Sequence, residues 1–235
     1  MCAIGMCPLP NGLPCSADIR FRNTSPTSRC PDPRGAPEMP HIPPVDLTAS
    51  EDAKADIEWL ASATGFVANS MLTLSHRPEI AKAVLGLIRA VVRSPGTVDP
   101  ALRWMVAHVT SLSNGCRYCS AHTFKNGADN GVPEDKLEAL WEFETNPIFS
   151  EAERAALRIA VTGGQCPSFA TPEDMAELRR HFSPEQVVEI GAVIALFGFN
   201  NRWNALMETD IEESVTSFVK SKNYHGPETL NSGQS

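Results

Sequence analysis

The amino-acid sequence predicts an all-α fold, a helical bundle. No stretch alternates apolar and polar residues with period two over the length of a strand. From residue 47 onward, apolar residues instead recur at helical spacing in successive segments. Proline, glycine and capping residues separate these segments, as they do at helix ends. With 235 residues, the chain is long enough to bury a sizeable core in one domain.

Residues 1–44 differ in composition from the rest of the chain. They hold ten of the nineteen prolines and four of the seven cysteines, with no helical periodicity. Such a segment cannot bury enough apolar surface to offset the entropy of ordering it, so we expect a disordered tail. The spacing of its cysteines matches no zinc-binding template. A helical domain is expected over residues 45–222, followed by a flexible tail at 223–235.

Capping residues predict where most helices begin. Thr48 and Ser150 each precede a glutamate by three residues, the pattern of a capping box. Asp99, Thr171 and Ser183 are each followed by proline, which is favoured in the first turn of a helix. The expected helices are 47–64, 77–93, one from 99, one that carries the cysteines described below, 134–145, one from 150, one from 171, and a long apolar one that begins at 183–184 and includes 187–207.

The helix that follows Asp99 has two distinct stripes. Its buried stripe is expected to consist of Leu102, Met105, Val106, Val109 and Leu112. Trp104, His108 and Ser111 fall on a different stripe, each about one turn from the next. Such a stripe is either exposed or lines a site.

The charge and hydropathy of the chain narrow the classes of partner. A formal net charge of −8 and a pI near 5.3 argue against nucleic acid or an anionic membrane surface. No apolar run is long enough for a membrane-spanning helix. The seven cysteines are not spread as a disulfide framework, which fits a reducing compartment, so we expect a cytoplasmic protein.

The stretch 114–125 carries the strongest chemical signal. Cys116 and Cys119 form a C-x-x-C pair, and His122 follows three residues later. On a helix these side chains are neighbours on one face. The Asn-Gly pair directly before them is a turn signal, so the cysteines are expected in the first turn of a new helix. Free N–H groups and the helix dipole lower a thiol's pKa there, which favours dithiol redox chemistry.

Two structural interpretations of the cysteine pair remain open. C-x-x-C is also half of a zinc site, although no second pair or H-x3-H follows at a useful spacing, and no metal is expected. The cysteines could also be buried apolar residues without chemistry.

A polar cluster interrupts the apolar last helix. It consists of Asn200, Asn201, Arg202 and Asn204. Buried arginine and asparagine cost free energy unless they are hydrogen-bonded. These side chains are therefore expected either to join helices together or to face a polar cavity.

Three motifs together resemble the alkylhydroperoxidase D-like and carboxymuconolactone decarboxylase superfamily. They are S-x-x-N-G-C-R-Y-C-x-A-H, G-T-V-D-P-x-L-R before it, and F-G-F-N-N-R-W-N after it. The similarity covers roughly residues 72–212 and looks closest to the two-segment, peroxidase-related members. It implies an AhpD-like helical bundle and a homo-oligomer.

The resemblance also implies roles for the cysteines. In the peroxidase members one cysteine attacks a hydroperoxide and its partner resolves the product as a disulfide. Carried over to this chain, Cys119 would be the attacking thiolate and Cys116 the resolving thiol. The helix dipole favours the opposite order, because the first cysteine of a helix-starting pair is nearer the helix N-terminus.

Two positions depart from the peroxidase pattern. A relay glutamate typically lies twelve residues before the first cysteine, and this chain has Trp104 there. His108, one turn nearer the cysteines, could act as the acid/base instead. The relay histidine commonly falls four residues after the second cysteine, but position 123 is threonine and the histidine is His122.

The leading hypothesis is a thiol-dependent peroxidase or dithiol oxidoreductase. His122, assisted by His108, would deprotonate Cys119, which would attack a small hydroperoxide. Cys116 would then close a disulfide that an external dithiol reduces. No cofactor is expected, because the sequence holds no dinucleotide or phosphate-loop signature and this chemistry needs neither haem nor flavin.

Two alternatives keep the fold and change the function. One is a cofactor-independent lyase or isomerase that acts on a small organic acid or lactone. There, His108 and His122 would provide acid-base catalysis and Arg202 would hold a carboxylate. In either reaction, Arg202, Asn201 and Trp104 are expected to contact the substrate. The other alternative is a non-catalytic helical interaction module with structural or redox-sensing cysteines.

Overall fold

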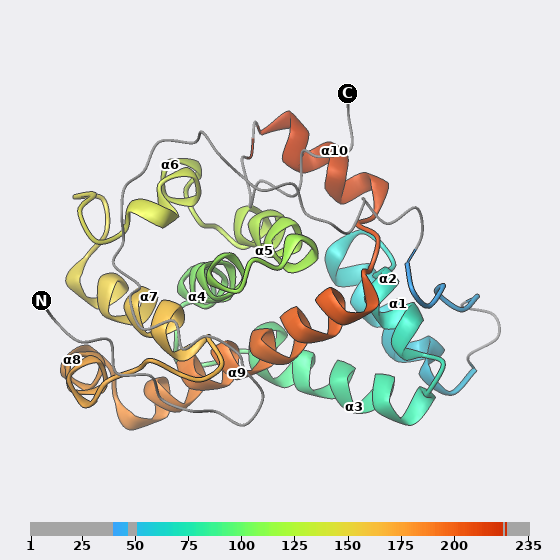
Figure 1. The fold of residues 1–235 in the computed structure, drawn as a ribbon, viewed down its shortest axis with the longest axis horizontal. Helices are drawn as coiled ribbons and strands as arrows, with labels where there is room; N and C mark the ends of the chain where they lie inside the picture. Colours follow the sequence, from blue (N-terminus) through green and yellow to red (C-terminus); the bar gives the residue numbers. More distant parts are fainter. Residues whose placement is uncertain (1–39, 47–50, 223, 225–235) are drawn as a thin grey trace, which may run out of the picture. The chain divides into compact units, whose positions relative to one another are not determined.

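Helix α4 (Pro100–Ser113) lies beside α5 (Arg117–Asp129) at the centre of the helical bundle (Figure 1). The computed structural model describes residues 40–46, 51–222 and 224. Every regular element among these residues is helical, so the predicted all-α fold is confirmed. The described residues all fall within the compact unit Ala36–Ser235.

Helices α7 (Glu151–Gly163) and α9 (Pro184–Met207) pack on α4, and α9 and α10 (Glu213–Ser221) pack on α5. The helix that carries the cysteines is thus held between α4, α9 and α10. The remaining elements are α1 (Glu51–Thr64), α2 (Asn69–Leu74), α3 (Pro78–Ile88), the π-helical turn η2 (Arg89–Arg93), α6 (Glu134–Glu138), the 3-10 turn η3 (Leu140–Glu142) and α8 (Pro172–His181).

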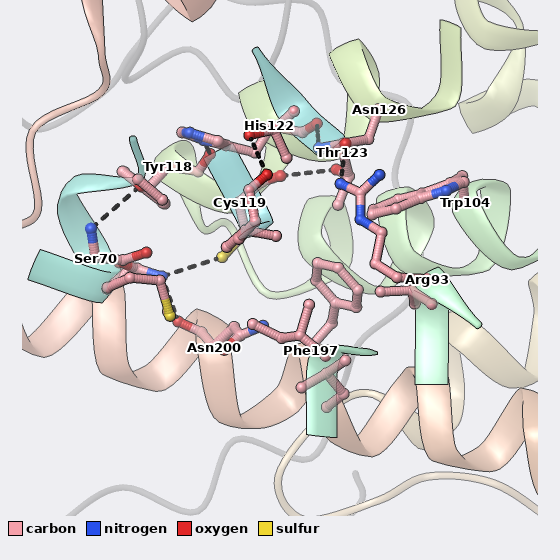
Figure 2. A pocket seen from close by; sticks show the side chains of 18 of the residues that line it. Ser70, Arg93, Trp104, Tyr118, Cys119, His122, Thr123, Asn126, Phe197 and Asn200 are labelled. Carbon is pink, nitrogen blue, oxygen red and sulfur yellow. Dashed lines mark hydrogen bonds between the residues drawn. The ribbon is translucent and has the colours of Figure 1, made fainter. Parts of the chain in front are cut away.

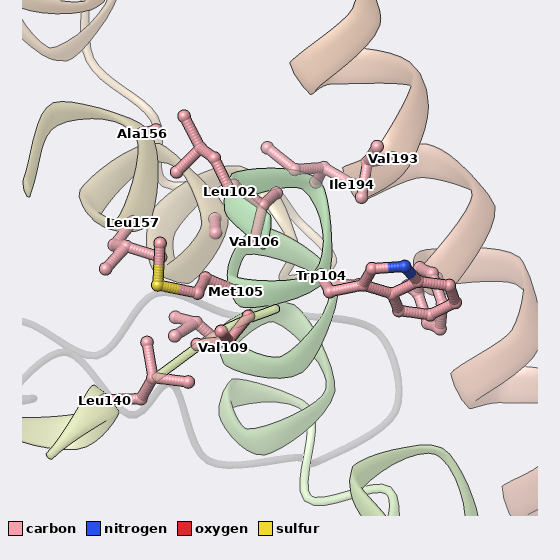
Figure 3. Close-up of a cluster of buried hydrophobic side chains, with 14 of the residues drawn as sticks. Leu102, Trp104, Met105, Val106, Val109, Leu140, Ala156, Leu157, Val193 and Ile194 are labelled. Atoms are coloured by element: carbon pink, nitrogen blue, oxygen red, sulfur yellow. The ribbon is translucent and has the colours of Figure 1, made fainter. Parts of the chain in front are cut away.

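Helix α4 is buried on all sides along most of its length. Every residue from Leu102 to Ser111 is buried. Figure 3 shows Met105 beside Leu157 of α7, while Trp104 points toward α9. A helix that is enclosed on all sides belongs to the core. The second stripe predicted from the sequence is therefore buried.

A smaller apolar cluster joins α1, α2 and α3. Its buried members are Ile57, Leu60, Ala68, Met71, Leu74, Ala81, Val84 and Leu85. Leu60, Ala68 and Met71 also face the pocket described below. The two apolar clusters therefore meet at the pocket.

The capping residues begin their helices as predicted. The Asp99 side chain accepts a hydrogen bond from the backbone N–H two residues further on, at the start of α4. Ser150, Thr171 and Ser183 each form a complete capping box. Thr48 lies outside the described residues.

The predicted helix over 134–145 is wrong in its second half. Helix α6 ends at Glu138, and η3 and turns follow. The buried residues Leu137, Leu140 and Phe143 are spaced by three, which matches a 3-10 turn because residues i and i+3 then align. The Arg154 guanidinium also donates to the carbonyl of Phe143 (3.3 Å), a backbone acceptor near the end of this segment.

The predicted helix over 77–93 is present but widens near its end. Helix α3 continues directly into the π-helical turn η2. The Arg103 Nη1 atom donates to the carbonyls of Val91 (3.2 Å) and Ser94 (2.9 Å), so a side chain satisfies acceptors at this helix end. Arg93, the last residue of η2, faces the pocket.

Segments at both ends of the described chain contact the bundle. Residues 40–44 belong to the predicted tail, and within them the backbone N–H of His41 donates to the carbonyl of Met207 (3.1 Å). Tyr224, in the predicted C-terminal tail, donates its backbone N–H to Val219 (3.0 Å). Residues 1–39 and 225–235 lie outside the described part. No helix in the described ranges has the length and apolar character of a membrane span.

Candidate active site

The turn between α4 and α5 places the first cysteine at the start of α5. Gly115 has a φ of +64°, a left-handed conformation that glycine adopts without steric cost. The Asn114 side chain donates to the carbonyl of Gly164 (3.1 Å), and the backbone N–H of Cys116 donates to that of Ser111 (3.1 Å). Cys116 is thereby fixed as the N-cap residue of α5, at the helix start predicted from the Asn-Gly pair.

The two thiols are buried and adjacent, and their pKa values are shifted in opposite directions. Cys116 Sγ accepts the backbone N–H of Cys119 at 3.4 Å. A hydrogen bond from the Cys119 thiol, with further help from backbone N–H groups, lowers the pKa of Cys116 despite its burial. Burial and the adjacent Cys116 raise the pKa of Cys119 well above its ordinary value. The reduced pair therefore ionises first at Cys116 and keeps its proton on Cys119.

Cys119 is the thiol of the pair that lines a pocket (Figure 2). The cavity volume is about 80 Å³, several times the roughly 10–15 Å³ that one water requires, so the pocket suits a small molecule. The Asn204 Nδ2 atom lies 3.4 Å from Cys119 Sγ and can donate to a thiolate there. Much of the wall is apolar or aromatic and includes Leu60, Phe66, Met71, Val92, Trp104 and Phe197.

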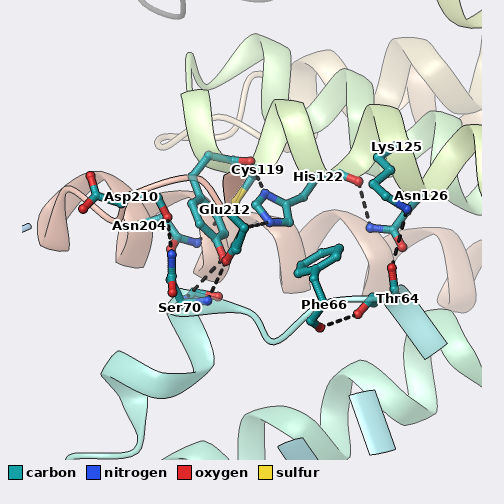
Figure 4. A network of polar contacts seen from close by, with 12 residues as sticks. Thr64, Phe66, Ser70, Cys119, His122, Lys125, Asn126, Asn204, Asp210 and Glu212 are labelled. Atoms are coloured by element: carbon teal, nitrogen blue, oxygen red, sulfur yellow. Dashed lines mark hydrogen bonds and ion pairs between the residues drawn. The ribbon is translucent and has the colours of Figure 1, made fainter. Parts of the chain in front are cut away.

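His122, on the same pocket wall, forms an ion pair with Glu212 (Figure 4). His122 Nε2 lies 2.6 Å from Glu212 Oε2, and Nδ1 lies 2.7 Å from the carbonyl oxygen of Tyr118. Both ring nitrogens face oxygen acceptors, so each is placed to donate a hydrogen bond. The Tyr118 ring stacks on it with 4.0 Å between centroids.

Glu212 is held in its ionised form by several donors. Burial alone would raise the pKa of this carboxyl, but His122 and the backbone N–H of Asn69 outweigh burial and lower it. The Oε1 atom accepts that N–H at 2.6 Å and the Tyr118 hydroxyl at 2.8 Å. The Glu212 carboxylate thus joins the segment before α10 to the start of α2 and to helix α5.

The sequence contains no local signal for Glu212 as a site residue. It lies 90 residues after His122 and immediately before α10. The family resemblance directs attention to position 104, where this chain has tryptophan. An acidic residue between two helices is too common a feature to single out without the fold.

His108 does not reach the pocket. Its Nδ1 lies 2.8 Å from Thr123 Oγ1, and its Nε2 lies 3.3 Å from the hydroxyl of Tyr224. Burial lowers the pKa of His108 to about 3, so the ring is neutral near pH 7. Both ring nitrogens thus have partners within the protein, and they connect α4 to α5 and to the C-terminal segment.

Trp104 is the one residue of the predicted substrate-binding set that lines the pocket. Its ring meets Phe197 edge-on, with 6.2 Å between centroids. The position where the resemblance places a relay glutamate therefore contributes an apolar wall.

Asn201 and Arg202 lie away from the pocket. Asn201 is buried, and its Nδ2 donates to the carbonyl of Thr110 (3.4 Å), so it joins α9 to α4. Arg202 is exposed and donates to the carbonyl of Gly198 in its own helix (3.1 Å). The histidine and arginine set of the lyase alternative is therefore not assembled at one place.

The helical bundle, the dithiol at the start of α5 and the pocket beside Cys119 define an all-α protein with a buried dithiol site. The model of the carboxymuconolactone decarboxylase family matches residues 78–162. The apo structure of the debrominase Bmp8 is 31% identical in sequence, with a TM-score of 0.71, and the match covers 77% of this chain and 97% of that one. The chain belongs to the carboxymuconolactone decarboxylase family, within the AhpD-like superfamily that its motifs resemble.

Two further proteins are similar to this chain. A peroxidase-related protein from Ralstonia eutropha JMP134 with an alkylhydroperoxidase AhpD core shares the fold, with a TM-score of 0.67 at 24% identity over 75% of this chain and 94% of that one. The uncharacterized protein YnjA of Escherichia coli (strain K12) is 29% identical over 116 residues, which cover 49% of this chain and 63% of YnjA.

Proposed function

We propose that the protein is a dithiol oxidoreductase that reduces a small organic hydroperoxide and closes a Cys116–Cys119 disulfide in the process. One observation carries this proposal: Cys119 lines an apolar pocket, while the thiol beside it at the helix N-cap has the lowered pKa. A pocket-facing sulfur and a readily ionised partner are what a two-step thiol reduction requires.

The first step oxidises Cys119. Its proton passes to the Cys116 thiolate, so the negative charge moves to the sulfur that faces the substrate. Asn204 donates a hydrogen bond to this charge. The Cys119 thiolate attacks the terminal peroxide oxygen, the S–O bond forms, and the O–O bond breaks. The departing alkoxide takes the proton from Cys116 and leaves as an alcohol, which returns Cys116 to its thiolate form.

The second step closes the disulfide. Cys116, again as a thiolate, attacks the sulfur of the Cys119 sulfenic acid, and the S–S bond forms as the hydroxyl group leaves as water. The sum is two thiols and one hydroperoxide to one disulfide, one alcohol and one water. An external dithiol would return the pair to its reduced form.

His122 has an electrostatic role in this scheme. Because both ring nitrogens already donate hydrogen bonds, His122 is a poor acceptor for the proton of Cys119. Its positive charge on the pocket wall favours the negative charge that develops on sulfur and then on the departing oxygen. The base for Cys119 is instead Cys116.

Mass spectrometry of alkylated thiols before and after one equivalent of cumene hydroperoxide tests the proposal. We expect stoichiometric formation of the Cys116–Cys119 disulfide. Cys116→Ser lacks the base for Cys119, so it should form a sulfenic acid on Cys119, trapped by dimedone, more slowly than wild type and should not close a disulfide. Cys119→Ser should consume no peroxide. Cys166→Ser is the matched control, because Cys166 is an exposed free thiol outside the pocket. Full peroxide consumption by Cys119→Ser would refute the proposal.

Reductive debromination is a second candidate, and the sequence match to the debrominase Bmp8 favours it. A cysteine-to-alanine variant of that protein was crystallised in complex with 2,3,4-tribromopyrrole. The same dithiol could act on such a compound. Cys119 would take bromine from carbon, the carbon would gain a proton, and Cys116 would displace bromide as the disulfide forms.

Bromide release distinguishes the two candidates. Reduced protein is incubated separately with cumene hydroperoxide and with 2,3,4-tribromopyrrole, and disulfide formation is followed in both. Bromide released in a one-to-one ratio to disulfide, with slow oxidation by the hydroperoxide, would select debromination. Fast oxidation by the hydroperoxide, with no bromide released from 2,3,4-tribromopyrrole, would select peroxide reduction.

A further inference from the structure

Arg93 brings a positive charge to the wall of the pocket. Its guanidinium carbon lies 4.8 Å from the centroid of the Trp104 ring, and Nη2 donates to the side-chain oxygen of Asn126. Figure 2 shows these three side chains on the opposite side of Cys119 from Ser70. The Nε atom of Arg93 is buried and has no hydrogen-bond partner among the described residues. An arginine has five N–H donors, and among the described residues those of Arg93 have one hydrogen-bond acceptor, Asn126.

Two other arginines of the same bundle differ from Arg93 because each has a carboxylate nearby. Arg103 and Arg154 also have a buried Nε, but each lies beside a glutamate, at 3.4 Å and 3.6 Å, and each donates to backbone carbonyls. In the described part of the chain, no ion pair joins Arg93 to a carboxylate. The negative charge of Asp129 acts on Arg93, but this carboxylate is ion-paired with Lys125 at 2.6 Å.

A partly buried charge without a counter-ion costs free energy, which a bound anion would recover. Burial lowers the pKa of Arg93, in keeping with that cost. The π-helical turn η2, which ends at Arg93, is a rare geometry that is frequent at functional sites. We propose that Arg93 binds an anionic group, a carboxylate or a similar oxyanion, of the molecule that occupies the pocket.

The shape of the pocket then defines the class of ligand. The N–H groups of Arg93 that do not donate to Asn126 can hold a carboxylate through two parallel hydrogen bonds. Trp104, Phe197 and Val92 enclose an apolar or aromatic body, and Cys119 faces the reacting atom. The substrate is thus a small amphiphilic anion. This inference rests on the proposed function in taking the pocket as the substrate site.

Equilibrium binding to the full-length Cys119→Ser protein tests the proposal without turnover. Isothermal titration calorimetry with benzoate and with benzamide compares two ligands of similar shape and different charge. We expect benzoate to bind more tightly. Arg93→Gln should weaken benzoate binding roughly tenfold to a hundredfold, the range for a hydrogen bond to a charged group, and leave benzamide binding unchanged.

Arg89→Gln is the matched control. Arg89 begins the same π-helical turn and lies over the Trp59 ring at 3.9 Å, but it pairs with Asp56 and does not line the pocket. It should keep the preference for benzoate. Arg93→Lys provides a second variant that retains the charge and loses the planar fork, so its benzoate affinity should fall between those of Arg93 and Arg93→Gln.

Equal affinities for benzoate and benzamide would overturn the proposal, as would no benzoate binding or a benzoate preference that survives Arg93→Gln. The comparison of the two ligands needs no substitution at Arg93, so a variant that fails to fold leaves the test intact. Failure of thiol oxidation would remove the proposed reaction and would not alter the binding result.

Discussion

His122 and Glu212 form a 2.6 Å ion pair that joins α5 to the residue before α10, and both side chains are about nine-tenths buried. Removal of one partner leaves the other charge buried and unpaired. Glu212→Gln should therefore destabilise the fold by about 3 kcal/mol and slow disulfide formation. Urea unfolding and the rate of disulfide formation measure the two effects. Glu213→Gln, at the exposed neighbouring position, should change neither.

The stability effect of Glu212→Gln should also depend on pH. The pKa of Glu212 lies below its ordinary value of 4.5, so the ion pair stabilises the fold fully above that value. Its contribution is lost as the pH falls through the lower pKa of the folded state. The difference in unfolding free energy between wild type and Glu212→Gln should therefore shrink in acid. A difference that grew in acid would contradict the ionised state of Glu212.

Asn204 should accelerate the reaction of Cys119. Its Nδ2 atom lies 3.4 Å from the sulfur, and a hydrogen bond to a charged group contributes about 1.5–3 kcal/mol. Asn204→Ala should therefore slow sulfenic acid formation about tenfold or more. Stopped-flow oxidation of the Cys116→Ser background provides the measurement. Arg202→Ala, which alters an exposed residue of the same helix, should react at the unchanged rate.

The neutral state of His108 should make the fold sensitive to acid. Its pKa is about 3 in the folded protein and about 6.5 when unfolded, so the unfolded chain takes up the proton first as the pH falls. Between these values stability should decline by up to about 1.4 kcal/mol per pH unit from this group. His108→Gln should show a shallower slope in chemical denaturation.

Gly164 should not tolerate a methyl group. A Cβ atom there would lie 2.6 Å from the carbonyl oxygen of Ala160 and 2.9 Å from Thr110 Cγ2, and both contacts are too close. Gly164→Ala should destabilise by about 1–3 kcal/mol. Gly86→Ala, within α3 where a Cβ meets open space, should stabilise by about 0.5–1 kcal/mol. Thermal unfolding should therefore show a lower melting temperature for Gly164→Ala and a higher one for Gly86→Ala.

Local features of the sequence predicted what local interactions control. Ser150, Thr171 and Ser183 cap their helices through bonds to residues three positions away, so the pattern alone was enough. The Asn-Gly pair likewise predicted the turn that positions Cys116 as an N-cap residue. In each case the partners lie within a few residues of one another.

Features that depend on residues far apart in the chain could not be predicted from the sequence. Glu212 acts on His122 across 90 residues. The lack of a carboxylate partner for Arg93 among the described residues can be recognised only when the surroundings of its side chain are known. The position of His108 on a helix face predicts an acid/base role. In the structure, however, its two ring nitrogens contact the hydroxyls of Thr123 and Tyr224. Tertiary packing, not helical spacing, decides these roles.

The sulfur of Cys116 is the cap of α5, and this makes the cap itself dependent on redox state. In the reduced protein it accepts the backbone N–H of Cys119 at 3.4 Å, and a thiolate strengthens this hydrogen bond. In a disulfide the same atom is a neutral and much weaker acceptor. Oxidation should therefore loosen the first turn of α5 and speed amide hydrogen exchange there.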